Sequence, residues 1–190
     1  MIKEICSLTN KTIAIIGDLI PLLDENDICE IANAAKIYIF GEKKLEANII
    51  NLVDKANTYC KPEIISTISG KCTCDNYAWH IVRSYSKGVL PKFDCILFKG
   101  KHLFEIDGLW IPLLSKIVRQ QGVAFFGDIE WSIEKSPTLN QNKNPSTKEN
   151  YSEEQMNIQT VKELLNIYLR DDFIEIVCKG YPNYRAYQRK

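Results

Sequence analysis

The sequence predicts an α/β fold in which a doubly wound, mainly parallel sheet of seven strands ends in a C-terminal antiparallel hairpin. Short β-branched apolar runs alternate with segments whose apolar residues recur at helical spacing. The connections between these segments are short, which is typical of parallel strands joined by covering helices. The last two strand-like segments have no helix between them, so they are expected to pair as a hairpin.

The N-terminal half predicts three strand–helix pairs. Residues 12–17 and 36–41 are apolar runs that end in glycine, as expected for buried strands. Apolar residues recur at helical spacing after each of these runs. The expected strands are residues 12–17, 36–41, 63–68, 93–98, 122–127, 172–178 and 184–188. The expected helices are residues 27–36, 45–56, 75–86, 104–120 and 152–169.

Capping and turn residues support several of these boundaries. Asp75 is a candidate cap for the third helix, which should turn Ile81, Val82 and Tyr85 inward. Pro112 should kink or divide the helix over residues 104–120, and Gly122 occupies the position where a helix end favours a left-handed residue.

The C-terminal part continues the pattern. Ser152 is followed three residues later by Gln155, as in a capping box. The turn over residues 180–183 then joins the last two strands.

Composition excludes several functional classes. Lysine plus arginine and aspartate plus glutamate each total 24, so the formal net charge is zero. A neutral chain argues against a dedicated binder of nucleic acid or of an anionic membrane. No apolar stretch is long enough to span a membrane, and residues 1–10 do not resemble a signal peptide. We expect a single cytoplasmic domain over residues 1–190, with its seven cysteines reduced, and leave homo-oligomer formation open.

One segment departs from the alternating pattern. Residues 134–150 are rich in asparagine, lysine, serine, proline and threonine, which predicts a flexible loop. Two interpretations have equal weight. The segment is a tolerated surface insertion, or it covers a pocket, because it leaves the carboxyl end of the fifth strand.

Open parallel sheets bind ligands at the carboxyl ends of their strands, so the residues after each strand are the candidates. Gly17 either makes a tight turn or lets the backbone approach a ligand. No glycine-rich phosphate loop follows it, which argues against NAD, FAD or a nucleoside triphosphate. Glu42, after the second strand, either accepts hydrogen bonds from a ribose or is a solvated acid beside lysines.

The fourth and fifth strands add a second candidate group. Asp128 and Glu130 follow the fifth strand, and His102 follows the fourth. Such groups bind a hard cation or act as a general base, but Asp128 as a turn cap and His102 as a surface residue are equally simple interpretations. Lys99 and Lys101 would repel a cation and favour an anionic ligand.

The stretches over residues 93–102 and 121–131, together with the element order, resemble the class I S-adenosylmethionine-dependent methyltransferase fold. The nearer resemblance is to small-molecule O-methyltransferases of the macrocin and cephalosporin-hydroxylase-like type. It implies methyl transfer from S-adenosylmethionine to a hydroxyl of a small-molecule substrate. The implied catalytic residues are His102 and Asp128. The implied cofactor-binding residues are Gly17, Asp18, Glu42, Ser69 and Gly70.

The sequence also departs from that family's pattern. The glycine-rich loop after the first strand is reduced to Gly17, and lysine or glycine replaces an expected acid at Lys71, Lys99 and Gly127. The loss of two acids that help to bind magnesium in metal-dependent members implies that no divalent metal is held here. The same losses support an alternative, a catalytically inactive protein of methyltransferase fold that serves as a binding or scaffold partner. A third alternative is another reaction on an anionic ligand.

Overall fold

A computed structural model describes residues 1–17, 24–41, 43–56, 61–66, 77–99, 111–127, 167–181 and 184–190. The strands are β1 (Thr12–Ile16), β2 (Lys36–Phe40), β3 (Glu63–Ser66), β4 (Phe93–Lys99), β5 (Val118–Gly127), β6 (Phe173–Ile176) and β7 (Arg185–Arg189). The helices are α1 (Ile2–Ile5), α2 (Glu25–Ala32), α3 (Lys43–Lys55), α4 (Tyr77–Ser86), the 3₁₀ helix η2 (Ile111–Leu113) and α5 (Leu114–Ile117).

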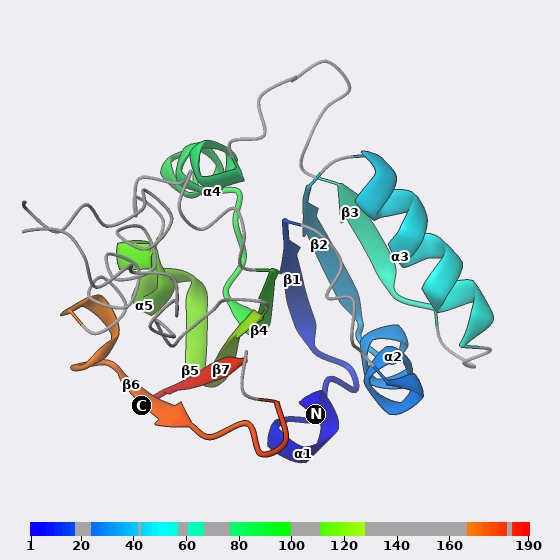
Figure 1. Cartoon of the computed structure of the whole chain (residues 1–190). Coiled ribbons are helices and arrows are strands. Elements are labelled where there is room, and N and C mark those ends of the chain that lie inside the picture. Colours follow the sequence, from blue (N-terminus) through cyan, green and yellow to red (C-terminus); the bar gives the residue numbers. More distant parts are fainter. Residues whose placement is uncertain are drawn as a thin grey trace, which may run out of the picture.

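The strands form one sheet whose order confirms the predicted fold. The order is β3-β2-β1-β4-β5-β7-β6 (Figure 1). Strands β1 to β5 pair in parallel, whereas β7 runs antiparallel to both β5 and β6. The chain winds outward from β1 to β3 and then returns to pair β4 with the other side of β1. This reversal leaves the switch point of the sheet between β1 and β4.

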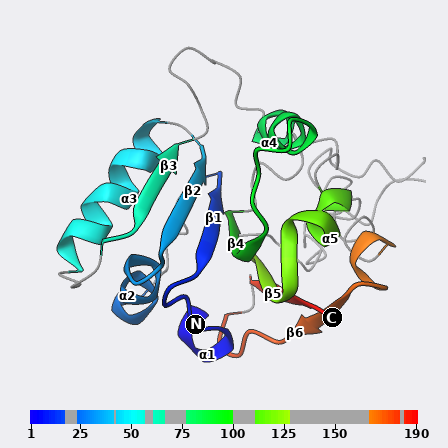
Figure 2. The ribbon, with the colours of Figure 1, turned by 180° about the vertical axis from the view of Figure 1, so that it is seen from behind.

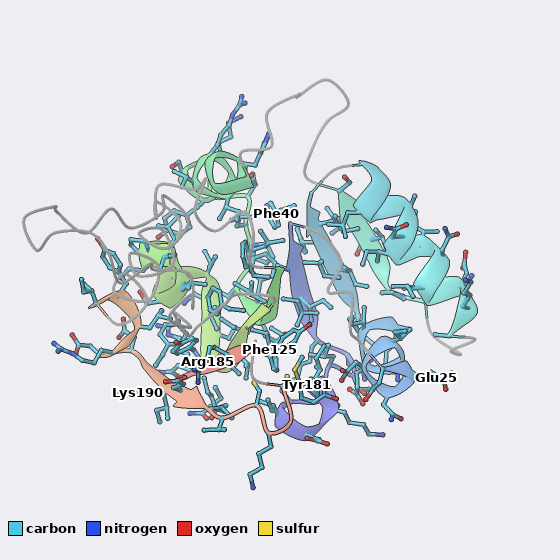
Figure 3. All side chains as sticks on the ribbon, in the orientation of Figure 1. Glu25, Phe40, Phe125, Tyr181, Arg185 and Lys190 are labelled. Carbon is cyan, nitrogen blue, oxygen red and sulfur yellow. The ribbon has the colours of Figure 1, made fainter. Side chains whose placement is uncertain are left out.

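Two apolar layers cover the faces of the sheet. One layer contains side chains of α4, η2 and α5, and the other contains side chains of α1, α2 and α3. Figures 1 and 2 show α2 and α3 beside β1 to β3, and α4 and α5 beside β4 and β5. Phe40 belongs to one layer and Phe125 to the other, and both are almost completely buried, whereas Glu25 and Lys190 are exposed at the periphery (Figure 3). Burial on both faces explains why these strands are apolar throughout instead of alternating.

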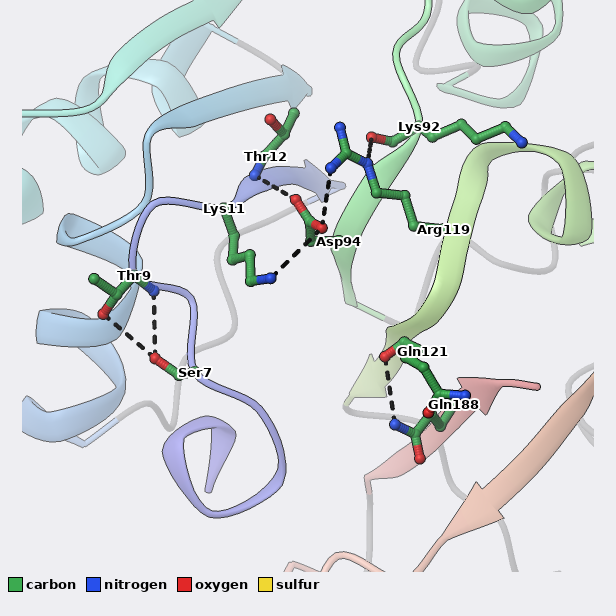
Figure 4. A network of polar contacts seen from close by, with 9 residues as sticks. All are labelled: Ser7, Thr9, Lys11, Thr12, Lys92, Asp94, Arg119, Gln121 and Gln188. Atoms are coloured by element: carbon green, nitrogen blue, oxygen red, sulfur yellow. Dashed lines mark hydrogen bonds and ion pairs between the residues drawn. The ribbon is translucent and has the colours of Figure 1, made fainter.

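Asp94 joins three strands at the amino edge of the sheet (Figure 4). Its Oδ2 accepts a hydrogen bond of 2.8 Å from the backbone amide of Thr12 at the start of β1. Its Oδ1 lies 3.5 Å from a guanidinium nitrogen of Arg119 in β5 and 4.0 Å from the Lys11 amino group. The carboxylate, which is only 15% exposed, therefore helps to fix the relative positions of β1, β4 and β5.

Two buried acids of α2 hold the N-terminal segment. Asp27 accepts a hydrogen bond of 2.6 Å from the backbone amide of Ile2 and lies 3.0 Å from the Met1 amino group. Glu30 accepts a hydrogen bond of 2.9 Å from the backbone amide of Leu8. The helix α1, which sequence periodicity does not predict, is only four residues long and depends on this tertiary anchor.

The predicted helix over residues 104–120 is wrong at its C-terminal end. Residues 118–120 already belong to β5, and α5 ends at Ile117. Gly122 is not a helix cap; the left-handed residue is Gln121, with φ 61°. The physical reason is a register shift, in which Phe93 pairs with Val118 but Cys95 pairs with Val123. Between these two pairs, β5 contains more residues than β4, as in a β-bulge. Residues 118–120 therefore belong to the strand and not to the last turn of the predicted helix.

Other expectations are corrected or lie outside the described residues. Tyr85 does not face the core, because 39% of it is exposed, whereas Ile81 is buried as predicted. Pro112 lies within η2, where a proline needs no amide partner. Residues 167–169, the described end of the helix predicted to start near residue 152, are helical. Asp75 and the loop predicted over residues 134–150 lie outside the described residues.

The described helices provide no membrane-spanning segment, because none combines sufficient length with sufficient apolar character.

Gly122→Ala should destabilise the fold. A Cβ at this position would lie 2.8 Å from a Val118 methyl group and 2.9 Å from the Arg119 carbonyl oxygen, so the backbone of the shifted segment would have to move. We expect the free energy of unfolding in urea to fall by about 2 kcal/mol. Gly88→Ala is the control, because its φ is +66° but its Cβ would meet no atom within 4 Å. Gly88→Ala should lower the free energy of unfolding by only about 1 kcal/mol, because only the backbone conformation is strained. An equal decrease in both variants would contradict the proposed clash at Gly122.

The stability of the protein should fall at alkaline pH. Burial and the nearby Glu175 raise the pKa of Tyr187 from 10.0 to about 12. The folded state therefore holds the phenolic proton more tightly than the unfolded state, so the stabilisation is complete below pH 10 and is lost as the pH rises to about 12. Chemical denaturation across this range should show a shallower decline in Tyr187→Phe than in wild type. Tyr168→Phe, at an exposed position, should decline as wild type does.

Candidate functional site

The candidate site is the carboxyl edge of the sheet beside the switch point between β1 and β4. Parallel strands leave their C-terminal residues at the same edge, and doubly wound sheets as a class bind ligands where the winding direction reverses. Gly17 follows β1 and Gly41 follows β2 at this edge. These two residues are the described part of the site predicted next to the first and second strands.

Gly17 turns the chain sharply at the end of β1. Its φ of 86° lies in the left-handed region, which only glycine adopts without steric cost. Its amide donates a hydrogen bond of 2.9 Å to the carbonyl of Phe40, the last residue of β2. The turn is therefore fixed to the neighbouring strand, and its conformation explains why glycine is retained although the rest of the family's glycine-rich loop is absent.

Gly41 brings β2 into close contact with this turn. A Cβ added to Gly41 would lie 2.6 Å from the carbonyl oxygen of Gly17 and 2.4 Å from the Cδ2 atom of Leu45. Leu45 belongs to α3, which begins two residues after Gly41, and only 3% of it is exposed. The two glycines thus place backbone against backbone at the edge. The Leu45 side chain fills the space that a Gly41 side chain would need, so this glycine is required by the packing of α3 against the turn.

Gly127, at the end of β5, is explained by a different contact. A Cβ there would lie 2.4 Å from the Cε1 atom of Tyr184, so the aromatic ring occupies the space that a side chain would need. Tyr184 is buried and packs edge-on against Tyr181, with ring centroids 6.0 Å apart. The glycine that replaces the acid expected from the family resemblance is therefore matched by a tyrosine from just before β7. Strand spacing alone could not reveal this partner, because it comes from a segment 57 residues later in the sequence.

Of the predicted site residues, the described part of the chain contains Gly17, which lies at the end of β1. The predicted residues outside the described ranges are Asp18, Glu42, Ser69, Gly70, His102 and Asp128. Lys99 is the last residue of β4, one residue beyond the predicted end of that strand. Sequence reasoning missed the contacts of Gly41 with Leu45 and of Gly127 with Tyr184. The glycine that ends the run over residues 36–41 was the available signal for the first contact.

The candidate metal ligands at this edge lie outside the described part of the chain. Within the described ranges, no three histidine, cysteine, aspartate or glutamate residues gather closely enough to hold a metal ion. The candidate ligands after β4 and β5, His102 and Asp128, lie outside those ranges.

Gly41→Ala should disturb the end of β1 through the backbone of Gly17. Two obstacles surround the new methyl group, the Leu45 side chain and the Gly17 carbonyl, and only the first can be removed by substitution. We expect Gly41→Ala to lower the free energy of unfolding by about 2 kcal/mol and to shift the NMR resonance of the Gly17 amide. In the Leu45→Ala background, Gly41→Ala should still shift that resonance. An unperturbed Gly17 amide in both backgrounds would contradict the close approach.

Comparisons with known proteins connect this arrangement to one fold. No family model matches the sequence, and no curated protein is similar to it in sequence. The chain is similar to a solved rRNA methylase from Streptococcus thermophilus, with a TM-score of 0.51 and 10% identity over 97% of this chain and 89% of that one. It is also similar to the O-methyltransferase TomG from Streptomyces achromogenes, solved with SAM, with a TM-score of 0.54 and 11% identity over 95% of this chain and 74% of that one.

A third similar structure has a different substrate class. It is a ribosomal protein L11 methylase from Lactobacillus delbrueckii subsp. bulgaricus, with a TM-score of 0.52 and 13% identity over 98% of this chain and 74% of that one. At such low identity, these likenesses establish architecture only. The chain has the Rossmann-like fold of class I S-adenosylmethionine-dependent methyltransferases.

Proposed function

We propose that the protein is an S-adenosylmethionine-dependent methyltransferase that acts on a hydroxyl of a small molecule, such as a sugar or a natural product. The observation that carries the proposal is the methyltransferase-type order of the sheet, which places the left-handed turn at Gly17 beside the switch point between β1 and β4. Two strands end there in glycine, and the first glycine is held in a left-handed turn. This is the edge at which doubly wound sheets bind nucleoside-containing ligands.

The residues around the two glycines fit an adenosine-containing cofactor. Glu42 directly follows Gly41 in the sequence, and in this proposal its carboxylate accepts hydrogen bonds from both ribose hydroxyls. Gly17 and Asp18 would line the side of the crevice next to β1, and Ser69 and Gly70 the side next to β3. S-Adenosylmethionine, when bound, supplies an electrophilic methyl group on a sulfonium.

The protein's own contribution to the reaction would be to orient the acceptor and remove its proton. His102, after β4, takes the proton of the acceptor hydroxyl, and Asp128, after β5, orients the histidine or acts as the base itself. Holding the acceptor oxygen in line with the methyl group would supply most of the rate. The resemblance over residues 93–131 supports a hydroxyl acceptor, as does the likeness to the O-methyltransferase TomG.

Glu42→Ala should weaken cofactor binding. Loss of a carboxylate that accepts hydrogen bonds from two ribose hydroxyls should cost roughly 1–3 kcal/mol, which corresponds to about 5- to 150-fold in Kd. Titration calorimetry with S-adenosylmethionine and S-adenosylhomocysteine measures this change. Glu46→Ala, an equal charge change in the first turn of α3, is the matched control and should leave the Kd unchanged.

The same titration separates the proposal from the inactive-scaffold alternative. Wild-type protein that gives neither heat nor a thermal shift at millimolar cofactor would refute methyl transfer and leave a methyltransferase fold without its cofactor.

His102→Ala and Asp128→Ala should separate binding from chemistry. Both residues act on the acceptor, so each variant should keep the wild-type affinity for S-adenosylmethionine. The rate of S-adenosylhomocysteine formation with a panel of sugar and phenolic acceptors should fall by about 10²- to 10⁴-fold for the residue that acts as the base. Wild-type rates in both variants would remove these residues from the catalytic mechanism.

A further inference from the structure

A second pocket lies at the amino edge of the sheet, opposite the proposed cofactor crevice. It has a volume of about 370 Å³. Its lining residues come from the end of α4, the segment before β4, the helix α5 and the end of β7: Tyr85, Leu90, Pro91, Lys92, Ser115, Lys116, Ile117 and Arg189. Because β4 spans seven residues, this pocket lies about 20 Å from the carboxyl edge. It is therefore a separate feature of the fold.

Three cationic residues line this pocket, and none of the described residues in its lining is acidic. Lys92, Lys116 and Arg189 each come from a different element. None of the ion pairs formed among the described residues involves any of the three. Three positive charges that line one pocket repel one another. An anion bound between them offsets this unfavourable electrostatic energy.

Asp94, the acid closest to Lys92 in the sequence, is already engaged elsewhere. Asp94 accepts the Thr12 amide and contacts Arg119 and Lys11, and the Lys92 side chain extends away from it (Figure 4). Arg119 also donates a hydrogen bond of 3.1 Å from its Nε to the Lys92 carbonyl, which holds the backbone at the pocket rim. The carboxylate of Asp94 therefore does not neutralise Lys92.

The pocket also has a fixed cation and an apolar wall. The guanidinium of Arg189 donates a hydrogen bond to the Val118 carbonyl, which fixes one cation at the end of β7. The hydroxyl of Ser115 adds a neutral donor to the lining. Tyr85, which sequence periodicity predicts to face the core, instead exposes 39% of its surface, and Leu90, Pro91 and Ile117 add apolar lining. The pocket thus combines cations with an apolar and aromatic wall.

We propose that this pocket binds a small phosphate ester, with the phosphoryl group held by Lys92, Lys116 and Arg189 and the organic part against Tyr85. Guanidinium and ammonium groups together form charge-assisted hydrogen bonds to phosphoryl oxygens. A small ligand is favoured over a nucleic acid because the basic cluster is short. The amino group of the next residue, Lys190, is bound to the carbonyls of Arg170 and Asp171 instead. The site is independent of the proposed cofactor crevice.

The probe for this proposal is phenyl phosphate, titrated into the full chain at low ionic strength and compared with inorganic phosphate and with phenol. Wild-type protein should bind phenyl phosphate more tightly than inorganic phosphate, and phenol more weakly than either. Lys92→Gln combined with Lys116→Gln should weaken both phosphate ligands by at least roughly tenfold. Tyr85→Ala should weaken phenyl phosphate but not inorganic phosphate.

The matched control is Lys3→Gln combined with Lys87→Gln, which removes the same charge at two exposed positions outside the pocket. It should keep the wild-type affinity for both phosphate ligands, and thermal unfolding should show that both double variants are folded. An equal loss of affinity in the two double variants would overturn the proposal, because the effect would then come from overall charge. Tighter binding of a single-stranded RNA octamer than of phenyl phosphate, lost in the Lys92 and Lys116 variant, would also overturn it.

A titration with S-adenosylhomocysteine distinguishes failure here from failure of the proposed function. Its affinity should be the same in the Lys92 and Lys116 double variant as in wild type, because the pocket and the crevice lie at opposite edges of the sheet. Competition between S-adenosylhomocysteine and phenyl phosphate would overturn the assignment of two separate sites.

Discussion

The pairing of β1 with both β2 and β4 is the constraint on which the rest of the structure depends. These strands are buried on both faces, so their residues are apolar without alternation and their backbone groups are satisfied only by neighbouring strands. Parallel pairing brings the ends of β1 and β2 together at the carboxyl edge, where Gly17 and Gly41 meet. Asp94 fixes the opposite edge by its bonds to β1 and β5. The two candidate sites therefore share one central element.

The two edges of the sheet have different chemical characters. At the carboxyl edge, the described contacts bring backbone close to backbone, which suits a ligand recognised by main-chain groups and a few acids after the strands. At the amino edge, long cationic side chains surround a pocket with an aromatic wall, which suits a phosphoryl group with an attached organic part. The separation of about 20 Å follows from the length of β4, because the strand runs from one edge to the other.

The departures from the family pattern have physical partners in the fold. Gly17 is the remaining glycine after β1, and its left-handed turn is tied to β2 by the hydrogen bond to Phe40. Gly127 stands where the family resemblance predicts an acid, and the ring of Tyr184 occupies the space that a side chain would take. The volume next to this glycine is thus filled by a residue from another segment. Close packing of this kind requires such compensation.

Local properties of the sequence were enough to predict the order of the strands, the parallel sheet and its terminal hairpin, because apolar periodicity and the lack of a helix before β7 can be read along the chain. The end of β1 beside Gly17 was predicted in the same way. The start of β5 at Val118, the anchoring of α1 by Asp27, the exposure of Tyr85 and the packing of Tyr184 against Gly127 emerged only from the folded structure. Each of these depends on a partner that is distant in sequence, and periodicity carries no information about such partners.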